Sequence, residues 1–317
     1  MPRHPVPTSL PIALENGHVY LQSVVQDPPS LGTSSSCRGL AIIAHPFGRL
    51  GGSLDDPIVT HLASLLLTHA YVRVVRFNSR GVGKSGGSAS WTGRSECSDF
   101  QEIVSKCVDN FCLDFPHTTA AQLIIAGYSA GSLYASTVRV PPAIYDLRQF
   151  RGGNRPRYIL LSFPAGVTWA LSFFTTKSYT NAFNKLLAST TTPGGNNRTV
   201  LDEREVKAAS RVAESTPSND GAAQPVSSHI ITIYGDQDQF TGLATYQTWT
   251  NECSSIAASP IRAELEAEGT QDRQKAQIGG STFHHVVIQG ADHFYRSNQA
   301  LDGLDKAVVE WLDALTD

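Results

Sequence analysis

The sequence predicts an α/β fold in which a mostly parallel central sheet is flanked by helices. Two observations support this prediction. Short apolar runs of strand length recur along the chain, and segments with a helical spacing of apolar residues separate them. The runs at 40–44 and 123–126 are apolar at every position, which is typical of strands buried on both faces of a sheet.

The predicted elements follow one another as in a wound α/β sheet. Strands are expected at residues 17–25, 40–44, 72–77, 123–126, 158–163, 229–234 and 285–288. The first of these alternates polar and apolar residues, which predicts antiparallel edge structure with the preceding segment. Asp55, Asp56 and Pro57 mark a helix start, because Asp caps a helix and proline fits its first turn. Further helices are predicted where apolar residues recur on one face, at 100–111 and 304–315.

Two segments lie outside this rhythm. Residues 1–163 and 229–317 form the predicted core, residues 164–228 a lid insertion, and residues 252–281 a second insertion within the core. The lid segment is rich in Ser, Thr, Asn and Gly, and a connection of this length usually has its own structure or a function. The alternative for its polar stretches is a disordered insertion without a role.

Composition and charge exclude several classes of protein. The formal net charge is −3 and no long basic run occurs, so nucleic acid is not an expected partner. No apolar stretch approaches the length of a membrane span, and the first residues contain no apolar core of a signal peptide. Five scattered cysteines without a C-x-x-C pair predict free thiols, no metal site and a cytoplasmic location. The expected partner is a small-molecule substrate, without a cofactor, and the oligomeric state stays open.

The sequence Gly127-Tyr128-Ser129-Ala130-Gly131 directly follows an apolar strand and precedes a run of small residues. A serine on a sharp strand-to-helix turn has unfavourable backbone angles and needs small neighbours, which the two glycines supply. Its hydroxyl then projects from the sheet edge near the N–H groups of a helix N-terminus. Ser129 is therefore the candidate nucleophile.

A serine nucleophile needs a base, and the base needs an acid that holds its tautomer. His293 follows the last predicted strand and is the candidate base. Asp236 and Asp238 both follow the strand before it. Asp238 is favoured as the acid because it can reach across the strand ends, whereas Asp236 is expected to bond backbone as a turn residue. Asp292 adjoins the base in sequence and is expected to point elsewhere.

Acyl transfer also needs hydrogen-bond donors for an oxyanion. The N–H of Ala130 is the first candidate, and the second is expected from the loop that follows strand 40–44. Pro46 has no N–H, so Phe47 is the predicted donor of that loop. His45, at the start of the loop, is placed among the substrate-contacting residues.

Aromatic side chains gather in the first part of the lid segment. Trp169, Phe173 and Phe174 are expected to face a cavity above Ser129 together with Phe47, which would favour apolar acyl groups. The alternative is that these aromatic residues attach the lid to the core.

Two motifs carry a resemblance to a known family. One is the loop from His45-Pro46 to Gly51-Gly52, and the other is the strand and turn of residues 76–87, which read R-F-N-S-R-G-V-G-K-S-G-G. With the serine turn, these motifs resemble the α/β-hydrolase superfamily, and within it a group of small single-domain serine hydrolases. The resemblance covers residues 38–163 and 229–295. It implies the fold and the set Ser129, Asp238 and His293.

The resemblance ends at the two insertions, which look longer than in the compact members, so it does not supply a substrate. The implied activity is cleavage of a carboxylic ester, thioester or lactone of a rather apolar small molecule through an acyl-serine intermediate. One alternative is a non-hydrolytic enzyme of small-molecule biosynthesis with His293 as general base. Another is a ligand-binding protein without turnover.

The glycine-rich residues 81–86 also fit a nucleotide-binding pattern. A phosphate loop would need glycine where Asn78 stands, and no helix start follows the stretch. A tight turn beside the active-site mouth is therefore the preferred interpretation, with Arg80 in a structural role.

Overall fold

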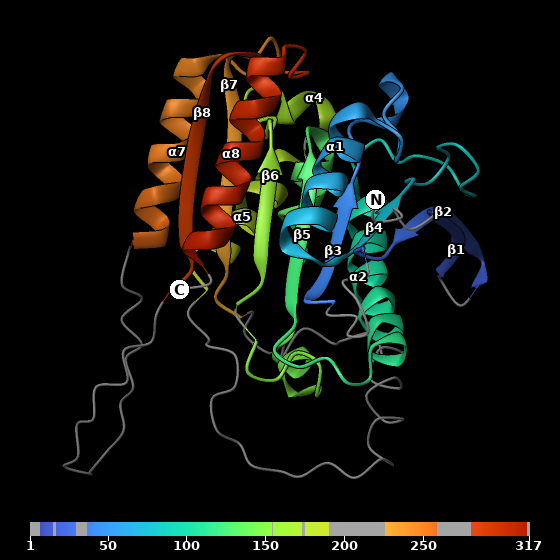
Figure 1. Ribbon diagram of the computed structural model, residues 1–317. Coiled ribbons are helices and arrows are strands. Elements are labelled where there is room, and N and C mark those ends of the chain that lie inside the picture. The colour runs from blue at the N-terminus through green and yellow to red at the C-terminus, as the bar shows by residue number, and fades with distance from the viewer. Residues whose placement is uncertain are drawn as a thin grey trace, which may run out of the picture.

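The computed structural model describes residues 7–14, 17–29, 37–153, 155–172, 175–189, 226–258 and 280–315. They form a single sheet of eight strands with the spatial order β1-β2-β4-β3-β5-β6-β7-β8. The strands are β1 (Thr8–Leu14), β2 (Val19–Gln26), β3 (Gly39–Ala44), β4 (Arg73–Phe77), β5 (Gln122–Tyr128), β6 (Arg157–Leu161), β7 (His229–Gln237) and β8 (Thr282–Asp292). The antiparallel pair β1–β2 forms one edge, β2 joins β4 antiparallel, and the other neighbours pair in parallel (Figure 1). This is the α/β sheet that the sequence predicts.

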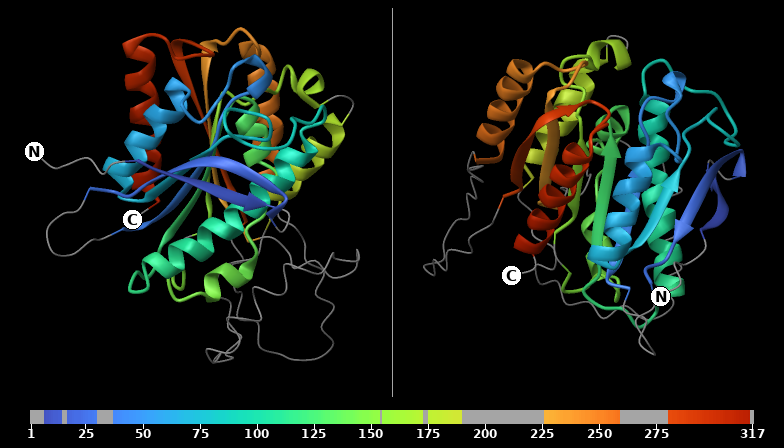
Figure 2. Two further views of the ribbon diagram at one scale, coloured as in Figure 1. Left: turned by 90° about the vertical axis from the view of Figure 1, so that its right-hand side faces the viewer. Right: turned by 45° about the horizontal axis from the view of Figure 1, so that its top comes forward.

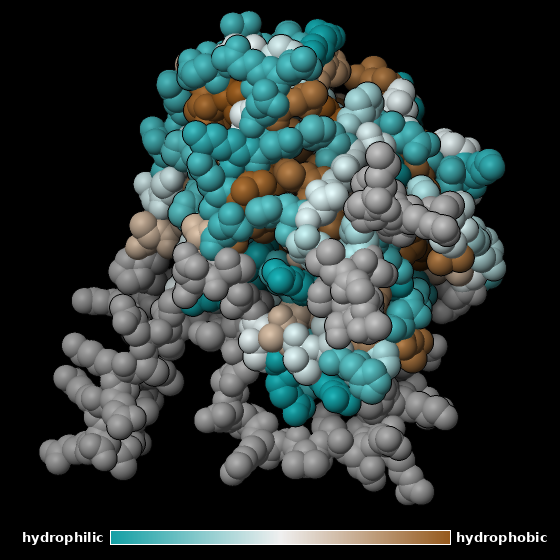
Figure 3. Space-filling model, in the orientation of Figure 1, coloured by the Kyte–Doolittle hydropathy of each residue, from teal (hydrophilic) through white to brown (hydrophobic). Residues whose placement is uncertain are grey.

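Helices cover both faces of the sheet. They are α1 (Pro57–Leu65), α2 (Arg94–Asp114), α3 (Ala130–Ala135), α4 (Thr168–Ser172), α5 (Thr176–Leu187), α7 (Leu243–Ala258) and α8 (Asn298–Ala314). Shorter helical turns are η2 (Gly48–Leu50), η3 (Leu66–Ala70) and η4 (Pro142–Asp146). Helices α1 and α8 lie on one face, while α2, α5 and α7 lie on the other (Figures 1 and 2). The outward side of α8 is largely hydrophilic (Figure 3).

The alternation of side chains along the central strands divides the core into two halves. Ala41 and Ile43 of β3 pack with α1 and α8, whereas Leu40 and Ile42 pack with α2 and α5. Every residue of β3 is buried. This two-sided burial is the physical reason why the strand is apolar at every position.

Helix α1 begins as the sequence predicts. The Asp56 side chain accepts a hydrogen bond of 2.9 Å from the N–H of Ile58, and Pro57 occupies the first helical position. The cap satisfies one of the helix N–H groups that has no partner within the helix.

The structure differs from the prediction in the second half of the chain. Helix α7 was not predicted, and residues 252–258, counted with the second insertion, form its last turns. Helix α5 lies in the segment predicted as a lid, yet its Tyr179 and Phe183 are buried against the core. The described part of the lid segment therefore includes a helix that packs on one face of the sheet. Residues 190–225 and 259–279 lie outside the described residues, so a lid stays a prediction.

Candidate active site

Ser129 lies directly after β5, at the carboxyl edge of the parallel strands. Its backbone has φ 53° and ψ −120°, a conformation that side-chain-bearing residues rarely adopt. The turn is held on one side by the Ser129 N–H, which donates to the Leu161 carbonyl at 2.8 Å. On the other side, the Ser132 N–H donates to the Ser129 carbonyl at 2.9 Å. Ser129 itself is half-buried, so its hydroxyl can be reached from outside.

The two glycines of the turn are required by close backbone contacts. A Cβ atom on Gly127 would collide with the carbonyl oxygen of Gly131. A Cβ atom on Gly131 would collide with the Ala44 carbonyl and come within 2.6 Å of the His45 carbonyl oxygen. The end of β3 and its loop therefore pack directly on the serine turn, and only glycine permits that approach.

The structure brings Ser129, His293 and Asp238 into one chain of hydrogen bonds. The Ser129 Oγ lies 3.0 Å from His293 Nε2, and His293 Nδ1 lies 2.7 Å from Asp238 Oδ2. The side chains of His293 and Asp238 are 4% and 0% exposed, so water does not compete for their hydrogen bond. A nucleophile, a base and an orienting acid are thus within hydrogen-bonding distance of each other.

The Asp238 carboxylate accepts more hydrogen bonds than the one from His293. Its Oδ1 accepts from the N–H groups of Phe240 and Thr241 at 2.8 and 2.9 Å, and its Oδ2 also accepts from the Tyr246 hydroxyl at 3.2 Å. Burial by itself raises the pKa of this carboxyl. The hydrogen bond and charge of His293 and the two N–H groups outweigh burial, so the pKa lies below its ordinary value.

The two neighbouring aspartates are bonded elsewhere. Asp236 Oδ1 accepts a hydrogen bond of 2.7 Å from the N–H of Gly290, across the strand ends. Asp292 pairs with Arg296 at 2.8 Å. Asp236 thus bonds backbone on β8 and not within its own turn, and Asp238 alone of the three carboxylates is bonded to His293.

An irregularity between β7 and β8 sets the relative position of acid and base. The register of the pair shifts between Gly235 and Gln237. A Cβ atom on Gly235 would collide with the Ala291 carbonyl, so the two strands lie in close backbone contact just before Asp238 and His293. This approach positions the two loops side by side.

Several contacts hold His293 that sequence reasoning did not identify. The Tyr128 hydroxyl donates to the His293 carbonyl at 2.9 Å, and the His293 N–H donates to Gln239 Oε1 at 3.2 Å. Tyr128 is the residue before the serine, so this bond joins the serine turn to the histidine loop. The position of Tyr128 within the turn was the one available signal, whereas nothing local in the sequence marks Gln239.

The loop after β3 is the second wall of the site. Within the described residues, neither the Phe47 nor the Ala130 N–H donates a hydrogen bond to backbone or side chain. The Phe47 carbonyl accepts from the N–H groups of Leu50 and Gly52 at 3.0 and 3.2 Å, which closes the loop into a turn. Two N–H groups without an intramolecular acceptor are what an oxyanion site requires.

His45 has a different environment from the one predicted. Its exposed fraction is 1%, its Nδ1 donates to the Pro46 carbonyl at 2.5 Å, and its Nε2 accepts from the Ser79 N–H at 2.9 Å. Burial lowers the pKa of the ring to about 4, although the Pro46 bond opposes this. Both ring nitrogens are engaged by backbone groups, so this geometry does not support the expected substrate contact. The neutral ring instead ties the Phe47 loop to the turn after β4.

The glycine-rich turn of residues 81–87 contains no helix start, and α2 begins at Arg94. Arg80 makes a two-pronged pair with the buried Asp99, with both nitrogen–oxygen distances 2.6 Å. Arg49, from the loop after β3, lies over the Trp91 ring with its guanidinium carbon 3.9 Å from the ring centroid. The Arg80 pair joins the turn after β4 to α2, and the Arg49 contact joins the loop after β3 to the segment before α2. A place of residues 81–86 beside an active-site mouth stays a prediction.

Of the aromatic residues predicted to face the serine, the structure describes Phe47 and Trp169. Trp169 lies on α4 and is 70% exposed. The segment before α4 contacts the loop after Asp238, because the Gly166 N–H donates to Thr241 Oγ1 at 3.1 Å. Phe173 and Phe174 lie outside the described residues. A role of Trp169 in the substrate site therefore stays a prediction.

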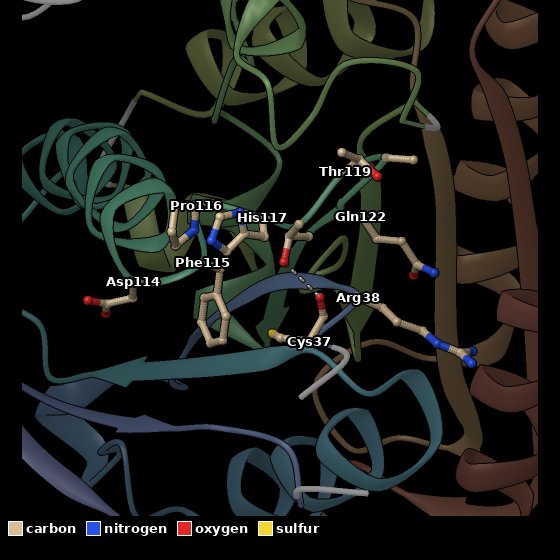
Figure 4. A pocket seen from close by; sticks show the side chains of 10 residues that line it. Cys37, Arg38, Asp114, Phe115, Pro116, His117, Thr119 and Gln122 are labelled. Carbon is tan, nitrogen blue, oxygen red and sulfur yellow. Dashed lines mark hydrogen bonds between the residues drawn. The ribbon is translucent and has the colours of Figure 1, made fainter. Parts of the chain in front are cut away.

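A cavity of about 460 Å³ lies far from this constellation. It is lined at the amino ends of β3 and β5 and at the end of α2, with Arg38, His117 and Gln122 among its side chains (Figure 4). Gln122, which lines the cavity, is the first residue of β5, and Ser129 directly follows its last residue. The length of the strand therefore puts about 20 Å between the cavity and the serine. The cavity is not part of the candidate site.

Two further findings concern the chemistry open to the chain. In the ranges that the structure describes, no three His, Cys, Asp or Glu side chains are grouped to hold a metal ion. Among the described helices, none has the length and apolar character needed to cross a membrane.

Comparison of the sequence with protein-family models and with curated proteins gives no match. Solved structures do resemble it. An α/β serine hydrolase homologue from Coxiella burnetii matches with a TM-score of 0.54 and 19% identity, over 96% of this chain and 96% of that chain. An α/β serine hydrolase from Xanthomonas campestris, described as lacking a lid, matches with a TM-score of 0.54 and 18% identity, over 99% and 96% of the two chains.

An esterase from Pyrococcus furiosus also matches, with a TM-score of 0.55 and 14% identity, over 99% of this chain and 92% of that chain. These likenesses extend along nearly the whole chain. They show that the protein has the α/β-hydrolase fold.

Proposed function

We propose that this protein is a serine hydrolase that cleaves an ester, thioester or lactone through an acyl-serine intermediate. The observation that carries the proposal is the hydrogen-bonded chain from the Ser129 Oγ through His293 to Asp238, at 3.0 and 2.7 Å. The strained backbone of Ser129 adds support, because strain of this kind persists where the surrounding structure enforces it and is common at active sites.

In the proposed first step, His293 Nε2 takes the proton of the Ser129 hydroxyl as its Oγ attacks the substrate carbonyl carbon. The N–H groups of Ala130 and Phe47 donate to the oxygen that becomes negative. The carbonyl then re-forms, the bond to the leaving group breaks, and His293 gives its proton to the departing oxygen or sulfur. The product of this step is the acyl-serine and a free alcohol or thiol.

In the second step, His293 Nε2 takes a proton from water as the water oxygen attacks the acyl-serine. The bond between the acyl carbon and the Ser129 Oγ then breaks, and His293 returns the proton to Oγ, which releases the acid and restores the serine hydroxyl. Asp238 stays ionised throughout and stabilises the imidazolium that forms in each step. Its lowered pKa is consistent with this role, since a carboxylate that is easily protonated could not supply a constant charge.

A fluorophosphonate probe and a panel of p-nitrophenyl acyl esters test the proposal. The probe is expected to label the wild-type protein on Ser129 and to spare Ser129→Ala. Ser136→Ala is the matched control, because the Ser136 Oγ is buried and donates to the Leu133 carbonyl at 2.7 Å. It should be labelled like the wild type.

Labelling of Ser129→Ala at the wild-type rate would exclude Ser129 as the nucleophile. Labelling of the wild type without turnover of any ester would instead favour the non-hydrolytic alternative, in which His293 serves as general base in another reaction.

A further inference from the structure

Two phenyl rings flank the imidazole of His293. The Phe240 ring meets it edge-to-face with centroids 4.6 Å apart, and the Phe294 ring does so at 5.3 Å. The two phenyl rings are 6.1 Å from each other. Each of these phenylalanines is 40% exposed, and neither belongs to either half of the hydrophobic core. Their exposed apolar surface is therefore not explained by packing of the fold.

The rings are held by the same turns that carry the acid and the base. Phe240 donates its N–H to Asp238 at 2.8 Å. Phe294 directly follows His293, and the Arg296 guanidinium carbon lies 4.4 Å from the centroid of its ring. Arg296 is itself held by Asp292 at 2.8 Å. The pair is thus a preformed apolar surface beside the imidazole.

The chemistry of acyl transfer says which part of a substrate meets this surface. The carbonyl oxygen must point to the N–H groups of Ala130 and Phe47, since negative charge develops there. The leaving oxygen or sulfur must lie beside His293 Nε2, because that atom returns the proton when the bond to the carbonyl carbon breaks. Exposed groups beside the imidazole are therefore placed to contact the leaving group in preference to the acyl chain.

We propose that Phe240 and Phe294 form the leaving-group subsite, and that the enzyme favours substrates whose alcohol or thiol part is uncharged and apolar, such as an aryl or long alkyl group. The proposal rests on the proposed hydrolase function. An apolar group that packs against the exposed sides of the two rings removes their surface from water, and it does so while the transition state forms.

Two series of esters test this subsite. The first keeps an acetyl group and varies the alcohol from methanol through butanol to benzyl alcohol, and the second keeps methanol and varies the acyl chain. Phe240→Ala and Phe294→Ala should each lower kcat/KM for benzyl acetate by about tenfold, the scale expected for a partly lost apolar contact. Methyl acetate and the acyl series should change by less than about twofold, because they place no large apolar leaving group against the rings.

Leu113→Ala is the matched control, since Leu113 is 78% exposed on α2 and lies outside both turns. It should leave both series unchanged, and Phe240→Leu should recover part of the benzyl acetate activity. Thermal unfolding checks that the variants fold. We expect them to fold, because Phe240 and Phe294 are partly exposed and lie outside the hydrophobic core.

Three results would overturn the subsite. An equal loss for methyl and benzyl acetate would mean that the rings only position His293. A loss that follows the acyl chain would place the acyl group there, and an unchanged alcohol preference would leave the rings without a role. A wild-type protein that hydrolyses none of these esters would refute the hydrolase function as well, which separates that failure from failure of the subsite alone.

Discussion

Replacement of Asp238 by Asn tests the proposed mechanism most directly. In both steps His293 becomes an imidazolium, and Asp238 Oδ2 lies 2.7 Å from its Nδ1. With an effective dielectric constant of about 20, unit charges at this distance attract each other by about 6 kcal/mol. Since about 1.4 kcal/mol corresponds to a factor of ten, loss of the charge should lower kcat/KM by about 10⁴-fold.

The hydrogen bonds around Asp238 determine how an Asn side chain at this position would be oriented. Oδ1 accepts from the N–H groups of Phe240 and Thr241, so an Asn side chain should keep its oxygen there. Its NH₂ group would then face His293 Nδ1 and donate to it. Nδ1 would have to be the acceptor, Nε2 would carry the proton, and the imidazole could not accept the proton of Ser129.

The assay is ester hydrolysis together with the rate of fluorophosphonate labelling of Ser129. Both rates should fall in Asp238→Asn, while thermal unfolding shows that the fold is kept. Asp236→Asn is the matched control, because Asp236 bonds the Gly290 N–H on the exposed edge and should change kcat/KM by less than about threefold. A loss of 10³-fold or more in Asp236→Asn, with an active Asp238→Asn, would refute the assignment of the acid.

Three further predictions follow from the packing of the site. Gly131→Ala should abolish most of the fluorophosphonate labelling of Ser129 and destabilise the fold, because its Cβ would collide with backbone. Gly242→Ala is the control, since there is open space around the added atom, and it should be neutral in the same labelling and unfolding assays. Between pH 6.5 and 4.5 the wild type should lose about 2 to 3 kcal/mol of unfolding free energy through His45 alone, because its folded-state pKa of about 4 lies below the ordinary value of 6.5 and only the unfolded chain takes up the proton. In denaturant unfolding at the two pH values, His45→Gln should therefore depend less on pH than the wild type, and an equal dependence would contradict the burial argument. Arg80→Ala should lower the unfolding free energy by about 3 to 5 kcal/mol, since it removes the arginine that pairs with the buried Asp99 carboxylate. Ser129 in the folded fraction should still be labelled. A change below about 1 kcal/mol would show that the pair does not stabilise the fold.

Local patterns predicted most of the sheet. The wholly apolar run at 40–44 identified a strand that the structure buries on both faces, and the alternation at 17–25 identified the antiparallel edge. Helix α7 was not identified, because the segment 243–258 has a weak apolar stripe and buries only Tyr246, Thr250 and Cys253. Its position is set by contact with β8 and α5.

The substrate contacts were the part of the site that the sequence predicted least well. His45 was placed against the substrate, yet the structure buries it with both nitrogens bonded to backbone. Its partner Ser79 is 34 residues away in sequence, so no local pattern could reveal the bond. The rings of Phe240 and Phe294 were missed for the same reason, because they adjoin each other only through the pairing of β7 with β8.

The sequence by itself determined the fold class and the candidate site residues, because strand-forming runs, glycines at a sharp turn and residues that follow strand ends can be read along the chain. The tertiary structure decided which carboxylate faces the histidine and what surrounds it. The register shift between Gly235 and Gln237 directs Asp238 toward His293 and leaves Asp236 on the edge. Such a choice depends on how two strands 55 residues apart meet, and that contact exists only once the sheet has formed.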